Sequence, residues 1–239
     1  MGCECQKIDD QNQELTAEET GVIKNLVPNN DYLLRKQKDN NNNNKNNINN
    51  INNNNNISQK SVKQNAKPLD EFSKYIFKQI NSLRQNPQAF IDVIQKAKEK
   101  VTLDKSGIKI YKSSVKVALN SGEPAFDEAI NILRNTEPMN KLIFNPNFVI
   151  DIPRNELDVK SREYLSEQIK KKVDEGVDVK SFWKDIVREP ESCFILTVVD
   201  DSGKNAGSKR NDILNKDNKY IGISSVKIGK SFACYIVIG

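Results

Sequence analysis

The sequence contains no histidine, and this absence excludes the commonest designs of catalytic and metal sites. Imidazole is the side chain whose ordinary pKa lies nearest neutral pH, and it is the most frequent general base and metal ligand. A nucleophilic cysteine would normally be activated by an adjacent histidine, which this chain cannot supply. We therefore expect no histidine-dependent catalysis, no metal site and no cofactor.

Cysteine is also scarce, with four in the whole sequence. Cys3 and Cys5 lie at the N-terminus, whereas Cys193 and Cys234 lie within apolar runs that are typical of strands. A small secreted scaffold held by disulfides would carry more cysteines than this. We expect Cys193 and Cys234 to be buried free thiols, with a bridge between them as the alternative.

Long hydrophobic runs are missing as well. No apolar run reaches the roughly 18 to 20 residues that span a bilayer, and the start lacks the basic-then-apolar pattern of a signal peptide. These features predict an intracellular protein that is not secreted. The mean hydropathy is low, at −0.67, largely because one segment, the asparagine-rich tract at residues 40–57, contains few apolar residues. Such a tract buries too little apolar surface to offset the entropy of ordering it.

Composition divides the chain into three segments. Residues 1–39 form an N-terminal arm whose eight acidic and five basic residues give a net charge of −3. Residues 40–67 form a low-complexity linker, interpreted as a disordered tether, and residues 68–239 form the globular domain. The whole chain carries +5, so the remainder carries +8, spread among many carboxylates. This pattern and the isoelectric point of about 8.8 fall short of the basic surface of a nucleic-acid domain, and aromatic residues interleaved with arginines are missing, so nucleic-acid binding is only a minor alternative.

The first five residues, Met-Gly-Cys-Glu-Cys, predict lipid attachment. Removal of Met1 would expose the amine of Gly2 to myristoylation, and Cys3 and Cys5 could carry palmitate. One myristoyl chain binds a membrane only marginally, so palmitate would supply the second signal. Gln6 replaces the preferred Ser or Thr, and the acidic arm offers no polybasic patch. The alternatives are two exposed unmodified thiols or a Cys-x-Cys metal site without further ligands.

Three amphipathic helices are predicted at the start of the globular domain, near residues 70–86, 88–100 and 121–138. The first begins at Pro68 and Asp70 and ends at Asn86-Pro87. Their apolar residues recur at spacings of three and four, which indicates faces that pack in a core. A variable linker is expected between the second and third helices, through Val115.

The second half is predicted to begin with a charged helix around Leu157–Val173, which stops at Gly176. Its Lys170–Lys172 run is interpreted as a solvated face, with contact to lipid headgroups or an acidic partner as the alternative. Strands are then predicted from Cys193, at residues 219–229 and at residues 230–239, the last two as an antiparallel hairpin. Helices followed by late strands favour an α+β fold with helices packed on one antiparallel sheet.

Several segments between residues 70 and 239 resemble the CAP superfamily, whose members include cysteine-rich secretory proteins, antigen 5 and pathogenesis-related proteins. The resemblance is closest to divergent protist sequences with this SCP domain. It implies an α-β-α sandwich. The matching segments in this chain are Ile80–Pro87, Gly122–Phe148, Phe194–Asp201, Gly207–Arg210, Asn211–Asn215 and Tyr220–Ser224.

In typical members of that family two histidines and two acidic residues form a tetrad in a central cleft. Where the family has Gly-His-Arg, this chain has Gly207, Ser208, Lys209 and Arg210. The resemblance therefore implies a degenerate site without the tetrad. Asp200-Asp201 is interpreted as a polar strand end and turn, because adjacent side chains of a strand point to opposite faces.

These observations lead to a functional expectation. We expect a non-enzymatic binding or scaffold module, held by acyl chains on Gly2, Cys3 and Cys5 at the cytoplasmic face of a membrane, either plasma or ciliary. Its partners would be the membrane and an unidentified protein. One alternative is a carrier of sterol-like lipids, which the family resemblance implies. The other is a cryptic hydrolase that uses carboxylates, Cys193 or Cys234.

Overall fold

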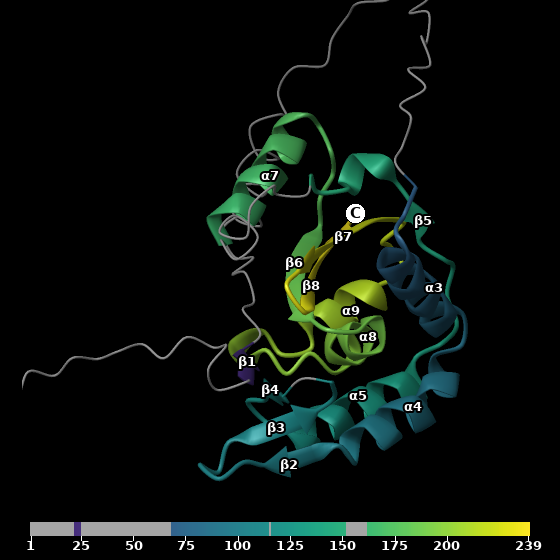
Figure 1. Ribbon diagram of the computed structural model, residues 1–239. Coiled ribbons are helices and arrows are strands. Elements are labelled where there is room, and N and C mark those ends of the chain that lie inside the picture. The colour runs from purple at the N-terminus through teal and green to yellow at the C-terminus, as the bar shows by residue number, and fades with distance from the viewer. Residues whose placement is uncertain (1–21, 25–67, 115, 152–161) are drawn as a thin grey trace, which may run out of the picture.

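The computed structural model describes residues 22–24, 68–114, 116–151 and 162–239 (Figure 1). The predicted acylation residues Gly2, Cys3 and Cys5, the linker at 40–67 and the first part of the predicted helix at Leu157–Val173 lie outside these residues. Within them, helices combine with two four-stranded sheets, so the α+β class is confirmed. The expectation of one sheet was wrong.

The C-terminal sheet has the strand order β5-β7-β8-β6. Its central hairpin joins β7 (Tyr220–Ile228) to β8 (Ser231–Ile238) through Gly229 and Lys230, which confirms the predicted antiparallel hairpin. β6 (Ser181–Val187) pairs antiparallel with β8 along its whole length, whereas the two-residue β5 (Ile143–Phe144) pairs parallel with β7. Phe182 and Trp183 lie on the seven-residue strand β6.

Helices cover both faces of this sheet. α3 (Glu71–Gln85), α8 (Pro190–Val199) and α9 (Ser208–Ile213) lie on one side, and α7 (Arg162–Asp174) lies on the other (Figure 1). Side chains alternate along β8 accordingly: Cys234 and Ile236 join the core beneath α3 and α8, whereas Tyr235 and Val237 join the core beneath α7. The result is an α-β-α sandwich.

The N-terminal sheet has the order β1-β4-β3-β2. It consists of β1 (Val22–Lys24), β2 (Val101–Leu103), β3 (Lys109–Lys112) and β4 (Lys116–Ala118). β2, β3 and β4 pair antiparallel, and β1 pairs parallel with β4. The sequence predicted a linker here, which was wrong. The strands have only three or four residues each, too short for a clear alternation of apolar and polar residues.

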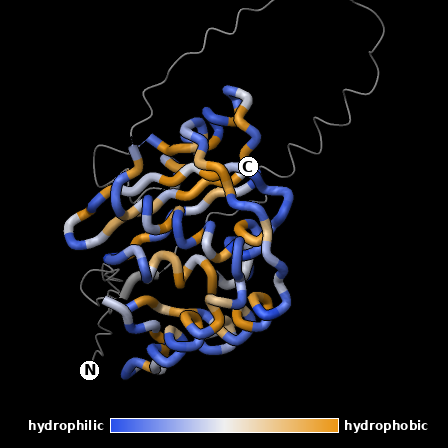
Figure 2. The backbone as a smooth tube through the Cα atoms, turned by 90° about the vertical axis from the view of Figure 1, so that its right-hand side faces the viewer, coloured by the Kyte–Doolittle hydropathy of each residue, from blue (hydrophilic) through white to orange (hydrophobic). Residues whose placement is uncertain are grey.

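This smaller sheet packs beside α4 (Ile91–Lys98) and α5 (Glu123–Asn135). The ring centroids of Tyr111 on β3 and Phe126 on α5 lie 5.9 Å apart. Along the helices hydrophobic and hydrophilic residues alternate, as amphipathic helices require (Figure 2). The predicted helical stripes are therefore core faces.

The first helix begins and ends where the sequence predicts. Asp70 caps α3 because its Oδ1 accepts a hydrogen bond from the N–H of Ser73 at 3.0 Å. After Asn86, Pro87 starts a short 3-10 helix, η1 (Pro87–Phe90), which leads into α4. Two further 3-10 turns, η2 (Pro146–Phe148) and η3 (Gly203–Asn205), lie in connecting segments.

Polar residues of α3 also fasten distant loops to the helix. The buried guanidinium of Arg84 donates to the carbonyl oxygens of Asn140, Ile213, Asn215 and Asn218. In addition, the side-chain amide of Asn81 exchanges two hydrogen bonds with the backbone of Leu142. Both residues belong to the Ile80–Pro87 segment on which the CAP resemblance partly depends.

The run from Cys193 is a helix, α8, so the predicted strand was wrong. All eight residues from Ser192 to Val199 are buried, and the helix therefore shows no amphipathic period. Its β-branched residues favour a strand when the sequence is considered alone. The signal that indicates a helix is Pro190 in its first turn, followed by the acidic Glu191.

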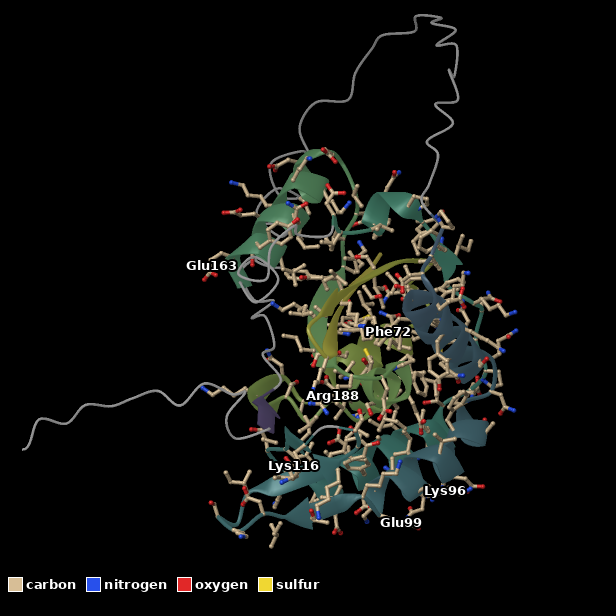
Figure 3. The ribbon with its side chains drawn as sticks, in the orientation of Figure 1. Phe72, Lys96, Glu99, Lys116, Glu163 and Arg188 are labelled. Atoms are coloured by element: carbon tan, nitrogen blue, oxygen red, sulfur yellow. The ribbon has the colours of Figure 1, made fainter. Side chains whose placement is uncertain are left out.

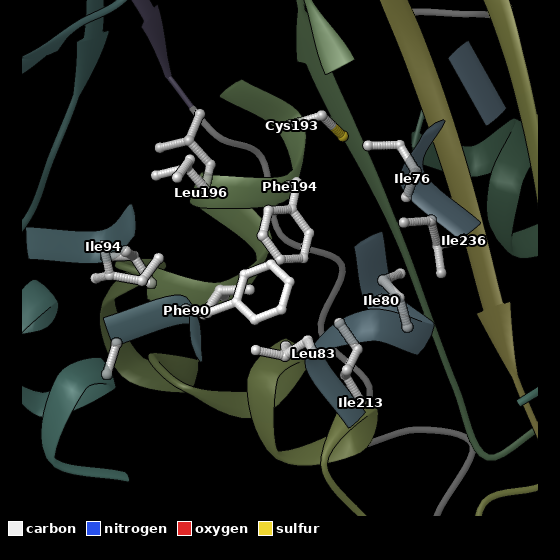
Figure 4. Packing of buried hydrophobic residues seen from close by; sticks show 14 of the residues in the cluster. Ile76, Ile80, Leu83, Phe90, Ile94, Cys193, Phe194, Leu196, Ile213 and Ile236 are labelled. Carbon is white, nitrogen blue, oxygen red and sulfur yellow. The ribbon is translucent and has the colours of Figure 1, made fainter. Parts of the chain in front are cut away.

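The main core lies between α3, α8 and the C-terminal sheet. Phe72 of α3 stacks on Phe232 of β8 at 4.9 Å, inside the molecule, whereas Lys96 and Lys116 lie at the periphery (Figure 3). The rings of Phe90 and Phe194 meet at 5.4 Å between η1 and α8 (Figure 4). Burial of these large side chains stabilises the fold by roughly 1.5–3 kcal/mol each.

Gly222 on β7 should not tolerate a side chain. A Cβ at this position would lie 2.3 Å from the carbonyl carbon of Phe148, a backbone atom that cannot rotate away. We expect Gly222→Ala to lower the free energy of unfolding by about 3 kcal/mol, measured by denaturant unfolding. Gly229→Ala, where a Cβ meets no atom within 4 Å, is the control. Gly229→Ala should lower the free energy of unfolding by only roughly 1–2 kcal/mol, the cost of placing alanine in a left-handed backbone conformation. Equal losses in the two variants would contradict the close approach of Gly222 to the backbone of Phe148.

Candidate functional site: a buried charge network at the start of α9

The segment Gly207–Arg210, which the family resemblance singles out, begins α9. Gly207 precedes the helix with a left-handed φ of 81°, and its N–H donates to the carbonyl oxygen of Asp200 at 2.9 Å. This turn directs two charged side chains into the molecule. Lys209 is 3% exposed and Arg210 is 1% exposed. A position expected to line a degenerate cleft is therefore part of the interior.

Lys209 forms a buried ion pair with Asp185 of β6. Its Nζ lies 2.6 Å from Asp185 Oδ1, while Asp185 Oδ2 accepts a hydrogen bond from Thr197 of α8 at 3.2 Å. Burial alone would lower the pKa of Lys209, but the carboxylates of Asp185 and Asp200 outweigh it and raise that pKa above its ordinary value. Lys209 therefore remains protonated near neutral pH, which is unsuitable for a lysine nucleophile.

Asp200 connects the end of α8 to the start of α9. It is the C-cap of α8 in a left-handed conformation, with a φ of 46°. Its Oδ2 accepts the backbone N–H of Lys209 at 2.8 Å and its Oδ1 accepts the hydroxyl of Ser202 at 2.7 Å. Burial raises the pKa of this carboxyl, and the charge of Lys209 opposes the rise. The interpretation of Asp200 as a strand end was wrong, because the preceding element is helical.

Arg210 completes the network on the side of α5. Its guanidinium donates to the carbonyl oxygens of Val198 and Val199 in the last turn of α8, at 3.1 and 2.9 Å. The same group pairs with Glu128 at 2.6 Å. Since the last carbonyls of a helix lack partners within it, Arg210 acts as a side-chain cap for α8.

Asp201 points in another direction. Its carboxylate accepts hydrogen bonds from the N–H groups of Ser121 and Gly122, at 2.8 and 2.9 Å, at the start of α5. A carboxylate at a helix N-terminus is stabilised by the unpaired N–H groups there. Asp200 and Asp201 thus serve two helix termini and do not converge as an acid pair.

Cys193 and Cys234 are buried and form no disulfide, which confirms the expectation of buried free thiols. A hydrogen bond with Cys193 and burial raise the pKa of Cys234 well above its ordinary value. Since the thiolate is the nucleophilic form, Cys234 is chemically inert in this environment. Cys193 lies on α8, however, and not on a strand.

Sequence reasoning missed the acidic partners in this network. Asp185 lies on β6 and Glu128 on α5, 24 and 82 residues before the basic residues that they contact. A weak signal was present: Lys184 and Asp185 interrupt the apolar residues of β6, and a buried charge requires a partner. The partner's identity is decided only by the packing of α9 on β6 and α8.

Across the described ranges, no three His, Cys, Asp or Glu side chains lie close enough together to hold a metal ion. The helices described there are also too short or too polar to cross a membrane. No family model matches this chain, and neither the curated proteins nor the solved structures include one that is detectably similar to it.

Loss of either partner of the Lys209–Asp185 pair should destabilise the protein strongly. A single Asp185→Asn or Lys209→Met substitution leaves one buried charge unpaired, which costs about 3–5 kcal/mol. We expect the double variant to lose less than the sum of the two single variants, by at least about 1 kcal/mol, because neither charge remains. Urea unfolding of all four proteins measures this difference. Additive losses would contradict a direct buried pair.

Stability should also fall at alkaline pH. The pKa of Lys209 is raised in the folded protein, so its stabilising contribution is complete below about 10.4 and is lost as pH rises through the folded value. Burial, reinforced by Glu191 and Glu189, raises the pKa of Tyr111 to about 12, which adds a loss of the same sign between pH 10 and 12. We expect the free energy of unfolding to decline above pH 10.

The separate contributions can be measured with two variants. The Asp185→Asn, Lys209→Met double variant should show a shallower decline, because the titrating lysine is gone. Tyr111→Phe should also show a shallower decline, without altering the part that is due to Lys209. A decline identical to that of the unmodified protein in both variants would contradict this assignment.

Proposed function

We propose that this protein is a non-enzymatic, CAP-like binding module that is attached to a membrane by acyl chains at its N-terminus. The observation that carries the proposal is the segment Gly2-Cys3-Glu4-Cys5, which combines one site for myristate with two for palmitate. Two acyl chains give stable attachment where one gives only marginal binding. The attachment would hold the domain at the cytoplasmic face, with residues 40–67 as part of its tether.

The interior of the domain supports a binding role over a catalytic one. Lys209, Arg210 and Asp185 are at most 3% exposed, and each is engaged by partners within the protein. A catalytic group must reach a substrate, whereas these groups join α8, α9 and β6 to one another. The segment that resembles the family's site thus stabilises the scaffold, and recognition would depend on the outer surface.

The resemblance to the CAP superfamily supports the same proposal. The α-β-α arrangement around the C-terminal sheet is the architecture that the resemblance implies, and the Ile80–Pro87 segment contributes the polar contacts of Asn81 and Arg84 to it. Family members of this kind bind proteins, peptides or sterol-like lipids. We propose a protein partner near the membrane for this chain.

Acylation can be tested with the full chain in eukaryotic cells that are supplied with alkyne analogues of myristate and palmitate. We expect both labels in the unmodified protein and neither in Gly2→Ala, because palmitoylation follows the first membrane contact. Cys3→Ser with Cys5→Ser should retain myristate, lose palmitate and shift at least about tenfold from the membrane to the soluble fraction.

Gln6→Ala is the matched control and should leave labelling and fractionation unchanged. Mass spectrometry of the N-terminal peptide gives an independent measurement. A peptide that retains Met1, or that begins with an unmodified Gly2, would overturn the proposed attachment.

A further inference from the structure

The outer edge of β4 is covered by a strand that comes from a distant part of the sequence. β1 pairs parallel with β4 at three register positions (Figure 1). The partners are Val22 and Lys116, Ile23 and Val117, and Lys24 and Ala118. Residues 25–67 separate β1 from the globular domain, whereas β3 and β4 are joined by a connection of only a few residues. Because closing a long connection costs more entropy than closing a short one, β1 is held by its own contacts and can be exchanged.

The backbone of β4 explains why this edge accepts a strand. The N–H of Leu119 donates to the carbonyl oxygen of Lys109 at 2.9 Å, and hydrogen-bonded pairs recur at every second residue of an antiparallel ladder. Val117 therefore turns its backbone N–H and carbonyl toward β3. The backbone groups of Lys116 and Ala118 turn the other way, toward β1. An edge with such groups is a template for an added strand.

Positive charge is concentrated at the end of the sheet where β1 begins. Lys112 and Lys116 are exposed register partners on β3 and β4, and like charges in that position destabilise a sheet. Arg188, labelled with Lys116 in Figure 3, donates to the carbonyl oxygen of Ser114 at 3.1 Å and adds a third cation. The acidic Glu189 accepts the N–H of Ser114 at 3.2 Å. Among the described residues, none of the three cations forms a salt bridge.

The segment of the arm that leads into β1 carries the opposite charge. Residues 14–21 contain three glutamates and no basic residue, and Glu18 and Glu19 are the nearest of them to Val22. Because β1 and β4 are parallel, the chain enters β1 at the end where Val22 lies beside Lys116. Glu19 is three residues before Val22, at most roughly 10 Å of extended chain. Long acidic and basic side chains can close that distance.

We propose that the edge of β4, together with Lys112, Lys116 and Arg188, is a binding site for an acidic extended segment, and that residues 18–24 of the same chain occupy it. The backbone of β1 supplies the added strand, and Glu18 and Glu19 neutralise the cations. The connection of residues 25–67 keeps this segment near the edge at an effective concentration on the order of millimolar. The chain's own segment therefore competes with any external strand.

This assignment deepens the proposed binding role, on which it rests, because it names the recognition edge and the chemistry of the segment that fits it. Occupancy by the arm makes the site self-inhibited, since a partner's acidic strand must displace β1. Displacement also changes the attachment to the membrane. The connection between Gly2 and the domain is residues 3–21 while β1 is paired and residues 3–67 after its release.

Cross-linking in the full chain measures the occupancy. Lys24→Cys with Ala118→Cys, called the reporter pair, places thiols on register partners whose separation a disulfide can span, in a chain with Cys3→Ser and Cys5→Ser. We expect the oxidant diamide to join them, detected by intact mass. Lys24→Cys with Lys105→Cys is the matched control. Its thiols lie roughly three strand spacings or 14 Å apart, so it should react at least about tenfold more slowly.

Charge reversal tests the electrostatic part. Glu18→Lys with Glu19→Lys should slow oxidation of the reporter pair roughly two- to tenfold at about 50 mM salt, the effect of two surface charge pairs, and less at about 300 mM. Adding Lys112→Glu with Lys116→Glu exchanges the signs on the two sides and should restore the rate to within about twofold.

The control for this rescue is Lys170→Glu with Lys171→Glu, which makes the same change in net charge at exposed positions of α7 and should restore nothing. Equal oxidation of the reporter pair and the Lys105→Cys control would overturn the occupancy. Rescue by both lysine pairs, or by neither, would overturn the assignment of Lys112 and Lys116.

A labelled peptide of residues 14–26 gives an independent measurement by fluorescence anisotropy. We expect it to bind the full-length Ile23→Pro variant at least about tenfold more tightly than the unmodified chain, because proline removes an N–H from β1 and frees the edge. Equal binding to the two proteins, or binding to neither, would contradict a displaceable strand. Both experiments use chain made in bacteria without acyl groups, so their failure leaves the acylation experiment to decide the proposed attachment.

Discussion

The buried pair of Lys209 and Asp185 is the constraint on which the centre of this domain depends. The pair joins α9 to β6 and, through Thr197, to α8, the helix that lies between them along the chain. Since an unpaired charge in the interior is highly unfavourable, these elements must adopt the one arrangement in which the two charges meet. The apolar core supplies most of the stabilisation, whereas the pair restricts how that core can be assembled.

The neighbouring contacts depend on this arrangement. With Lys209 inside, its N–H reaches the carboxylate of Asp200, which ends α8, and Arg210 lies over the last carbonyls of that helix. Glu128 then neutralises Arg210 from α5. The charges of the Asp200–Arg210 region are thus directed inward, toward helix termini and one another.

Much of the helical structure could be predicted from sequence because its signals are local. Asp70 begins α3 and Asn86-Pro87 ends it through contacts within a few residues. The hairpin of β7 and β8 is equally local, since Gly229 and Lys230 form its turn. The failures involve elements without such signals. α8 is buried on all sides and lacks a helical period, and the N-terminal sheet is built from strands too short to show alternation.

The sequence by itself determined the absence of histidine, the boundaries of α3 and the α+β class, because these depend on residue identity or on neighbours along the chain. Only the tertiary structure decided that Lys209 and Arg210 are buried, that Asp185 and Glu128 are their partners, and that Lys112 and Lys116 face each other across β3 and β4. The physical reason is that an electrostatic contact depends on distance in space. Residues separated by 24 or 82 positions become neighbours only when the elements that carry them pack.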